Sequence, residues 1–173
     1  MFATILLPNF YLQAALRHEP NLRSKAIAVL DGDATKALLL EVNETAEKAG
    51  VCAGMAPSQA LARCLHLIVK ARARSQEQCV TEVLLEHAFT LSPLVEATAP
   101  GVCTVQFTTY QNLQEKAERV IEQLCDVQIT AQAGIGPTPD ASLLAAHFGR
   151  PVLRIGDART FLASLPIEAL AQT

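Results

Sequence analysis

The segment Val42–Cys64 constrains the fold of this chain more than any other stretch. Its sequence, VNETAEKAGVCAGMAPSQALARC, predicts two short helices. The first, Asn43–Ala49, is expected to end at Gly50, because glycine readily adopts the left-handed conformation that follows many helices. The second, Pro57–Cys64, is expected to begin at its proline, which suits the first helical position. The apolar residues predict that the two helices pack as a pair through Ala46, Ala49, Ala60, Leu61 and Cys64.

Around this pair, apolar runs and alternating patterns predict a series of strands and helices. The expected strands are Phe2–Leu7, Ala26–Leu30, Ala37–Val42, Val102–Phe107, Val127–Ile135 and Val152–Ile155. The expected helices are Tyr11–His18, one from Ser75 up to Pro93, Thr109–Leu124, and one from Thr138 to Gly149. This order predicts an α+β fold: a ferredoxin-like β-α-β-β-α-β sheet of antiparallel type with helices on one face, and an inserted small helical and β lobe.

Length and composition suit one or two small apolar cores, since half of the 173 residues are apolar. No apolar run approaches the roughly 20 residues that a membrane-spanning helix needs. The N-terminus MFATILLPNF lacks the basic region and cleavage site of a signal peptide. We therefore expect a cytoplasmic protein without membrane association. The net charge of −3 does not favour strong DNA binding, which needs clustered cations.

One cluster of basic residues is an exception to the negative net charge, and it consists of Lys70, Arg72 and Arg74. Alternating basic residues of this kind form either a solvated linker surface or a contact with a nucleic-acid backbone. The sequence leaves both interpretations open.

Cysteine and histidine spacing gives no metal-binding motif. The four histidines are far apart in the sequence, and none of the five cysteines forms a Cys-x-x-Cys pair. We expect the cysteines to be buried reduced thiols on apolar faces, rather than zinc ligands. They are Cys52, Cys64, Cys79, Cys103 and Cys125.

Two further motifs have both a structural and a chemical interpretation. Asp31 and Asp33 form a D-x-D, which is either a metal pair or, because Asp31-Gly32 joins two strand-like runs, a hairpin turn. We favour the turn. Gly134 and Gly136 form a Gly-x-Gly, which is either a phosphate loop or a tight turn from strand into helix. The third glycine of a dinucleotide-binding loop is missing, so the turn is again favoured.

The Val42–Cys64 segment resembles the fingers signature of Y-family, UmuC-like DNA polymerases, which is roughly Asn-Tyr-Glu-Ala-Arg-x-x-Gly-Val-x-x-Gly-Met. The chain has the same residues as that signature at six positions, which are Asn43, Ala46, Gly50, Val51, Gly54 and Met55. The resemblance places Glu44 and Glu47 where the family has the Tyr and Arg that grip the incoming triphosphate. Carboxylates at these positions would repel a polyanion. A second segment, from Gly134 to Ala146, places Pro139 at the family's phosphate-binding lysine.

The family's metal-binding acids also have no counterpart. The resemblance places Pro8 at the acid that follows the first strand, and Gly101 and Val102 at the Asp-Glu pair of a later hairpin. That hairpin's last Asp corresponds to Gln106. Catalysis by two metal ions depends on such carboxylates. The resemblance therefore implies that the chain has no catalytic, nucleotide-binding or metal-binding residues and needs no cofactor.

The resemblance covers nearly the whole chain and implies a domain plan. Residues 1–10 would hold the first palm strand, 11–75 the fingers lobe, 76–166 the rest of the palm, and 167–173 the start of a linker to an absent thumb. A chain in which the family's acids are replaced while the rest of the signature is kept resembles the ImuB-like inactive subgroup. That subgroup serves as an adaptor in translesion synthesis, SOS mutagenesis and DNA repair. Its partners would be the sliding clamp, a RecA-like protein and an error-prone C-family polymerase. DNA binding would be weak without thumb and little finger.

Two other functions compete with the adaptor. A weakly active Y-family polymerase would bind Mg²⁺ through relocated acids such as Asp31, Asp33, Glu44 or Glu96. A ferredoxin-like regulatory or ligand-binding domain unrelated to polymerases would show the sheet without a separate lobe at about residues 11–75.

Overall fold

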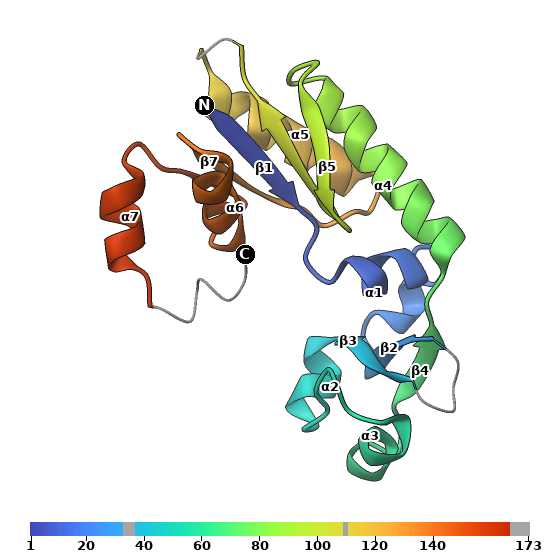
Figure 1. Ribbon diagram of the computed structural model, residues 1–173. Coiled ribbons are helices and arrows are strands. Elements are labelled where there is room, and N and C mark those ends of the chain that lie inside the picture. Colours follow the sequence, from blue (N-terminus) through green and yellow to red (C-terminus); the bar gives the residue numbers. More distant parts are fainter. Residues whose placement is uncertain (33–36, 109–110, 167–173) are drawn as a thin grey trace. The chain divides into compact units, whose positions relative to one another are not determined.

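The computed structural model describes residues 1–32, 37–108 and 111–166. The chain divides into two compact units, which we call the first and the second unit. The first unit comprises Met1–Pro8 together with Thr81–Thr173, and the second unit comprises Asn9–Val80. The second unit is thus an insertion after the first strand of the first. Figure 1 shows the helices and strands of both units.

The first unit is built on a five-stranded sheet with the order β5-β6-β1-β7-β8. Strand β1 is antiparallel to β6 and to β7, β5 is antiparallel to β6, and β8 runs parallel to β7. The bounds are β1 Phe2–Leu6, β5 Val95–Ala99, β6 Val102–Gln106, β7 Gln132–Gly136 and β8 Val152–Arg154. Its helices are α4 Arg74–Phe89, which begins in the second unit, α5 Leu113–Asp126, α6 Pro139–His147 and α7 Ala158–Ser164.

The predicted fold class is confirmed. The succession β1, α4, β5, β6, α5, β7 with the strand order β5-β6-β1-β7 is the ferredoxin-like arrangement expected from the sequence. Helix α5 lies behind this sheet in Figure 1, and α6 follows β7 and packs on the other face. The parallel strand β8 extends the sheet beyond the ferredoxin-like set.

Helix α6 approaches β7 so closely that two glycines are needed. A Cβ atom at Gly134 would lie 2.2 Å from the backbone nitrogen of Ala146 and 2.2 Å from the carbonyl oxygen of Ser142, and at Gly136 it would lie 3.0 Å from the nitrogen of Ser142. The fully buried hydroxyls of Thr4 and Ser142 meet at 2.7 Å across the same contact. The Gly-x-Gly motif therefore serves strand–helix packing, in addition to leading into α6.

The strand predicted at Val127–Ile135 was placed too early, because the observed strand β7 begins only at Gln132. Gln128 has a left-handed φ of 62°, and the amides of Gln128 and Ile129 donate to the carbonyls of Cys125 (2.8 Å) and Leu124 (2.9 Å). This is the Schellman pattern, so these residues end α5, and β7 covers only Gln132–Gly136. The predicted helix Thr109–Leu124 corresponds to α5, and Thr109 lies outside the described residues.

The second unit contains a three-stranded sheet with the order β3-β2-β4. Strands β2 (Ile27–Asp31) and β3 (Leu38–Val42) form the predicted antiparallel hairpin, while β4 (Ile68–Ala71) runs parallel to β2. Strand β4 was missed, because residues 68–71 lead into the basic cluster that we interpreted as a linker. The helices are α1 Phe10–Ala15, the 3₁₀ turn η1 Pro20–Leu22, α2 Glu44–Lys48 and α3 Pro57–Arg63.

Helices α2 and α3 form where the sequence predicted them. The Asn43 side chain accepts from the amide of Ala46 at 3.1 Å, and Gly50 has a φ of 81° just after α2. Ala46 and Ala60 are fully buried in one core, as expected. Ala49 and Leu61 were expected in the same contact and are exposed, because two such short helices bury only one narrow stripe each.

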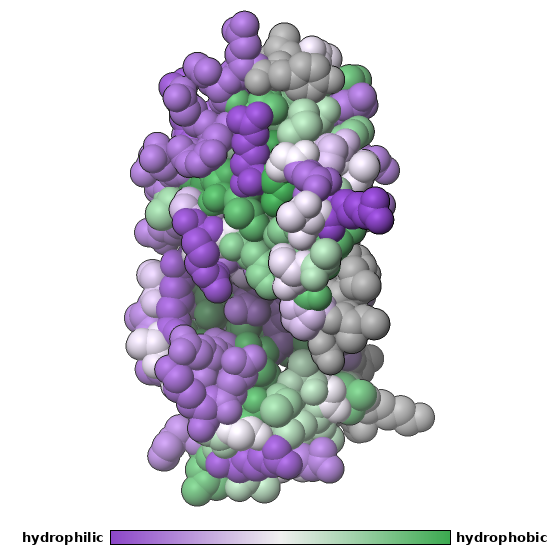
Figure 2. Space-filling view, turned by 90° about the vertical axis from the view of Figure 1, so that its left-hand side faces the viewer, coloured by the Kyte–Doolittle hydropathy of each residue, from purple (hydrophilic) through white to green (hydrophobic). Residues whose placement is uncertain are grey.

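The expectation of buried cysteines is wrong for most of them. All five thiols are free, but only Cys103 is buried, while Cys64 is half-buried and Cys52, Cys79 and Cys125 are exposed. Large apolar side chains also reach the surface, among them Leu65, Phe89 and Leu38. On the face drawn in Figure 2, hydrophobic and hydrophilic residues are interspersed. Among the described residues, no helix is both long and apolar enough to cross a membrane.

Candidate functional site

The end of β1 meets the β5–β6 turn in the first unit. Leu6 is paired with Val102, and the amide of Leu7 donates to the carbonyl of Gly101 at 2.8 Å. Pro8 follows directly in the chain. The structure thus brings Pro8, Gly101 and Val102, which are far apart in the sequence, to one end of the sheet.

The chemistry available at this sheet end is apolar. Gly101 has a φ of 72° in the turn after Pro100, Val102 is buried, and none of the three predicted positions carries a carboxylate. The neighbouring thiol of Cys103 is fully buried, and burial raises its pKa to about 12. It stays protonated at neutral pH and is a poor metal ligand or nucleophile.

Gln106 does not join this group. It is paired with Phe2, at the opposite end of both strands from the Leu6–Val102 pair. Four residues along an extended strand span about 13 Å. A side chain at position 106 is therefore not placed to share a ligand with positions 101 and 102.

Glu44 and Glu47 lie in the first turn of α2, in the second unit, and both are exposed. Glu44 forms an ion pair with Lys48 at 2.7 Å, one helical turn on. The hydrogen bond from Lys48 holds the pKa of Glu44 below its ordinary value. Carboxylates in the first turn also suit the helix dipole. Here they stabilise α2, and they make this surface anionic.

Two of the three residues in the predicted basic cluster are neutralised within the second unit. Lys70, on β4, pairs with Glu19, and Arg72 pairs with Glu77 and Asp31. Arg74 is exposed and makes no ion pair with the described residues. A phosphate backbone would have to compete with internal carboxylates for Lys70 and Arg72.

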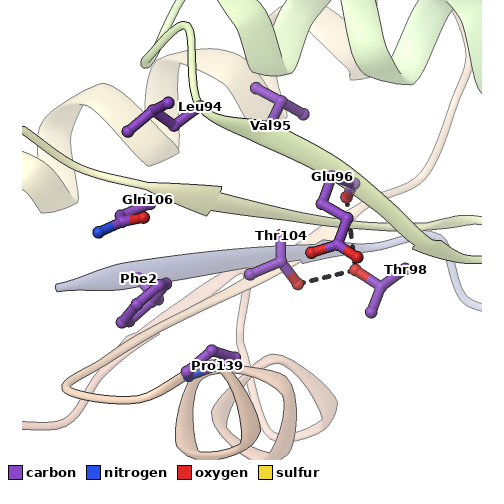
Figure 3. Close-up of a pocket in the computed structure, with 8 residues that line it drawn as sticks. All are labelled: Phe2, Leu94, Val95, Glu96, Thr98, Thr104, Gln106 and Pro139. Carbon is purple, nitrogen blue, oxygen red and sulfur yellow. Dashed lines mark hydrogen bonds between the residues drawn. The ribbon is translucent and has the colours of Figure 1, made fainter.

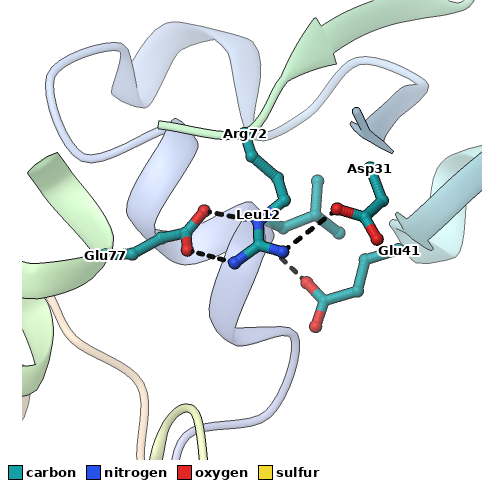
Figure 4. A network of polar contacts seen from close by, with 5 residues as sticks. All are labelled: Leu12, Asp31, Glu41, Arg72 and Glu77. Atoms are coloured by element: carbon teal, nitrogen blue, oxygen red, sulfur yellow. Dashed lines mark hydrogen bonds and ion pairs between the residues drawn. The ribbon is translucent and has the colours of Figure 1, made fainter. Parts of the chain in front are cut away.

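Arg72 is the centre of a polar network (Figure 4). Its guanidinium donates to both carboxylate oxygens of Glu77, at 3.0 and 2.7 Å, and to Asp31 at 3.1 Å. It also lies 4.5 Å from the ring centroid of Tyr11, a cation–π distance. The hydrogen bond to Glu77 is the main cause that raises the pKa of Arg72. Asp31 is thus held as an ion-pair partner, and Asp33 lies outside the described residues.

Glu41 is a member of this region that the sequence analysis did not single out. Its carboxylate accepts from the backbone amide of Leu12 at 2.9 Å, at the start of α1. Burial raises the pKa of Glu41, the amides of Leu12 and Tyr11 oppose this, and the charge of Glu77 adds to it. The available signal was one acid within the apolar run Leu38–Val42. The backbone amides of Tyr11 and Leu12, at the start of α1, therefore have a carboxylate of the same unit as their acceptor.

Pro139 begins α6, and the hydroxyl of Thr138 caps this helix by accepting from the amide of Ala141 at 3.2 Å. Pro139 also lines a pocket of about 300 Å³ on the sheet of the first unit (Figure 3). The other lining residues are Phe2, Leu94, Val95, Glu96, Thr98, Thr104 and Gln106. Across the described part of the chain, no group of three or more His, Cys, Asp or Glu residues is placed to hold a metal ion.

The architecture matches that of solved Y-family DNA polymerase structures. The insertion ternary complex of Dbh DNA polymerase is similar over 97% of this chain and 53% of that chain, with a TM-score of 0.85 and 17% identity. DinB from Sulfolobus solfataricus gives a TM-score of 0.85 at 19% identity, over 97% of this chain and 52% of its own. The fold therefore defines the palm-and-fingers class of Y-family polymerases.

The chain itself belongs to the impB/mucB/samB family, whose model matches residues 5–147. It is 25% identical over 170 residues to DNA polymerase IV of Ralstonia nicotianae, covering 93% of this chain and 48% of that protein. It is 28% identical over 175 residues to DNA polymerase IV 1 of Halalkalibacterium halodurans, covering 94% and 41%. The chain thus spans less than half the length of these relatives. The alternative of a domain unrelated to polymerases is wrong.

Proposed function

We propose that this chain is a non-catalytic, ImuB-like Y-family module that acts as an adaptor or scaffold in translesion synthesis, SOS mutagenesis and DNA repair. The observation that carries the proposal is the sheet end formed by Pro8, Gly101 and Val102, because none of these three residues has a carboxylate. Nucleotidyl transfer by two metal ions needs carboxylates that converge on both ions. A proline, a glycine and a buried valine supply none.

The phosphate-binding positions support the same proposal. Glu44, Glu47 and Pro139 offer no cation to a triphosphate, and the two glutamates repel it. Arg72, a cation of the second unit, already binds two carboxylates. An incoming anion would have to break those ion pairs.

An adaptor role implies protein partners rather than a substrate. The partners we propose are the sliding clamp, a RecA-like protein and an error-prone C-family polymerase, in the cytoplasm, with DNA bound weakly. The proposed domain plan assigns residues 1–10 to the first palm strand, 11–75 to the fingers, 76–166 to the rest of the palm, and 167–173 to a linker toward a thumb.

A weakly active polymerase is the second candidate, and it is favoured by the relatives, which are named DNA polymerase IV. It would bind Mg²⁺ through Asp31, Asp33, Glu44 or Glu96. Two of these acids are already committed, since Asp31 pairs with Arg72 and Glu44 with Lys48.

Calorimetric titration with Mg²⁺ and a deoxynucleoside triphosphate separates the two candidates. The matched control is the segment of the Ralstonia nicotianae polymerase that aligns with this chain. We expect binding by the control and none by this chain. Magnesium-dependent binding by this chain that is lost in Asp31→Ala or Glu44→Ala would favour the polymerase and refute the non-catalytic role.

A further inference from the structure

Strand β5 forms one edge of the sheet in the first unit. The amide of Gln106 donates to the carbonyl of Leu94 at 2.9 Å, so the even-numbered residues of this ladder face β6. In an antiparallel pair the intervening residues direct their N–H and C=O groups to the other side. Val95 and Ala97 therefore present theirs to the outer edge. Residues 96–99 are all exposed, so this edge is open to a further strand.

The pocket next to this edge has a defined chemistry (Figure 3). Glu96 is the one charged residue that lines it, and its carboxylate forms no ion pair with the described residues. The hydroxyls of Thr98 and Thr104 meet at 2.9 Å beside it. Leu94, which directly precedes β5 and is 48% exposed, gives an apolar surface beside it. An exposed acid beside hydroxyls and apolar surface is suited to a ligand with an apolar stem and a cationic head.

As the ligand of this pocket, these features favour an arginine side chain of a partner protein over a nucleic acid. The acid would repel a phosphate backbone, whereas a guanidinium gains a charge-assisted hydrogen bond from it. The arginine stem can pack on Leu94 while its head reaches the carboxylate and the threonine hydroxyls. A strand added to β5 would lie about 4.8 Å away, which puts a side chain opposite Glu96 within reach.

We propose that the β5 edge and this pocket form a docking surface for an extended segment of a partner protein. The segment pairs with Val95 and Ala97 and places an arginine against Glu96. The ladder of β5 is irregular between Ala97 and Ala99, which limits the pairing to a short segment. The inference rests on the proposed adaptor role, because it names the surface that such a role would use.

The test uses amide NMR spectra of the ¹⁵N-labelled chain, titrated with the peptide Ac-Val-Thr-Arg-Val-Thr-NH₂. The matched probe replaces arginine by citrulline, which has the same shape without the charge. We expect shifts at Val95, Ala97 and Thr98, and a Kd about fivefold lower for the arginine peptide, as an exposed ion pair contributes. In Glu96→Gln the two peptides should bind equally. Glu122→Gln, which removes an exposed acid of α5, should keep the difference.

Three results would overturn the docking surface. They are equal binding of both peptides by the unaltered chain, a preference that persists in Glu96→Gln, and shifts confined to other elements. A single-stranded dT octamer that shifts the β5 amides when the peptide does not would assign the pocket to nucleic acid instead. Nucleotide binding in the calorimetric titration would refute only the non-catalytic role, so the two failures are distinguishable.

Discussion

The two units are stabilised by different means. The first unit depends on close backbone contact, since α6 packs on Gly134 with no room for a side chain and the buried hydroxyls of Thr4 and Ser142 meet across the contact. The second unit, around a smaller sheet, has apolar cores as well, and the contacts that set it apart are ion pairs of Arg72 and Lys70 with internal acids. Arg72 and Lys70 are therefore engaged within the second unit, and an anionic ligand would have to compete with internal acids for them.

The largest effect should come from filling the close contact in the first unit. Gly134→Ala places a Cβ atom 2.2 Å from backbone atoms of α6, which cannot move independently. We expect the free energy of unfolding to fall by about 3 kcal/mol or more, measured by urea denaturation. Gly156→Ala is the matched control, because nothing lies within 4 Å of the added atom. A loss below about 1 kcal/mol would show that the packing is looser than described.

The second effect tests the charge network of the second unit. Arg72→Met leaves Glu77, whose side chain is only 10% exposed, without its main partner. We expect a loss of about 2 to 3 kcal/mol in urea denaturation, less than for a fully buried pair. Arg74→Met removes an exposed arginine and should change stability by no more than about 0.5 kcal/mol. Equal effects of the two substitutions would refute a structural role of Arg72.

Helix caps allow a direct comparison of the units. Thr138 caps α6 through one bond, from the amide of Ala141. Asn43 caps α2, and its side chain also accepts from the amide of Ile27 at 3.0 Å and donates to the carbonyl of Lys25 at 2.6 Å. We expect the free energy of unfolding to fall by about 2 kcal/mol in Asn43→Ala and by about 1 kcal/mol in Thr138→Ala, measured by thermal unfolding. The reverse order would show that the added bonds of Asn43 contribute little.

The smallest effect is a difference in pH dependence. Because burial raises the pKa of Glu41, the folded chain favours the protonated form, and its stability contribution falls as pH rises through the window above the ordinary value of 4.5. Glu41→Gln should therefore gain stability relative to the unaltered chain as pH rises from about 4 to about 7. Denaturant midpoints across this range provide the measurement.

Glu44→Gln is the control of opposite sign. The pKa of Glu44 is lowered by Lys48, so its contribution is present above the ordinary carboxyl pKa and is lost as pH falls through the lowered value. This variant should lose stability relative to the unaltered chain at neutral pH. Parallel pH profiles of the two variants would contradict the opposite environments of the two acids.

The sequence predicted those parts of the fold that have local signals. The left-handed Gly50 and the start of α6 at Thr138 and Pro139 formed as expected, because each depends on residues within one turn of chain. The order of strands and helices was sufficient to give the ferredoxin-like class. Alternation alone was misleading at Val127–Ile135, where a helix cap competes with a strand.

By itself, then, the sequence determined the type and order of most elements. Only the tertiary structure decided which groups meet. It brought the end of β1, just before Pro8, to Gly101 at one sheet end and placed Gln106 at the other. It also paired Arg72 with Glu77 and Asp31, and Lys70 with Glu19. The physical reason is that hydrogen bonds, ion pairs and burial depend on distances between segments far apart in the chain, which local patterns do not encode.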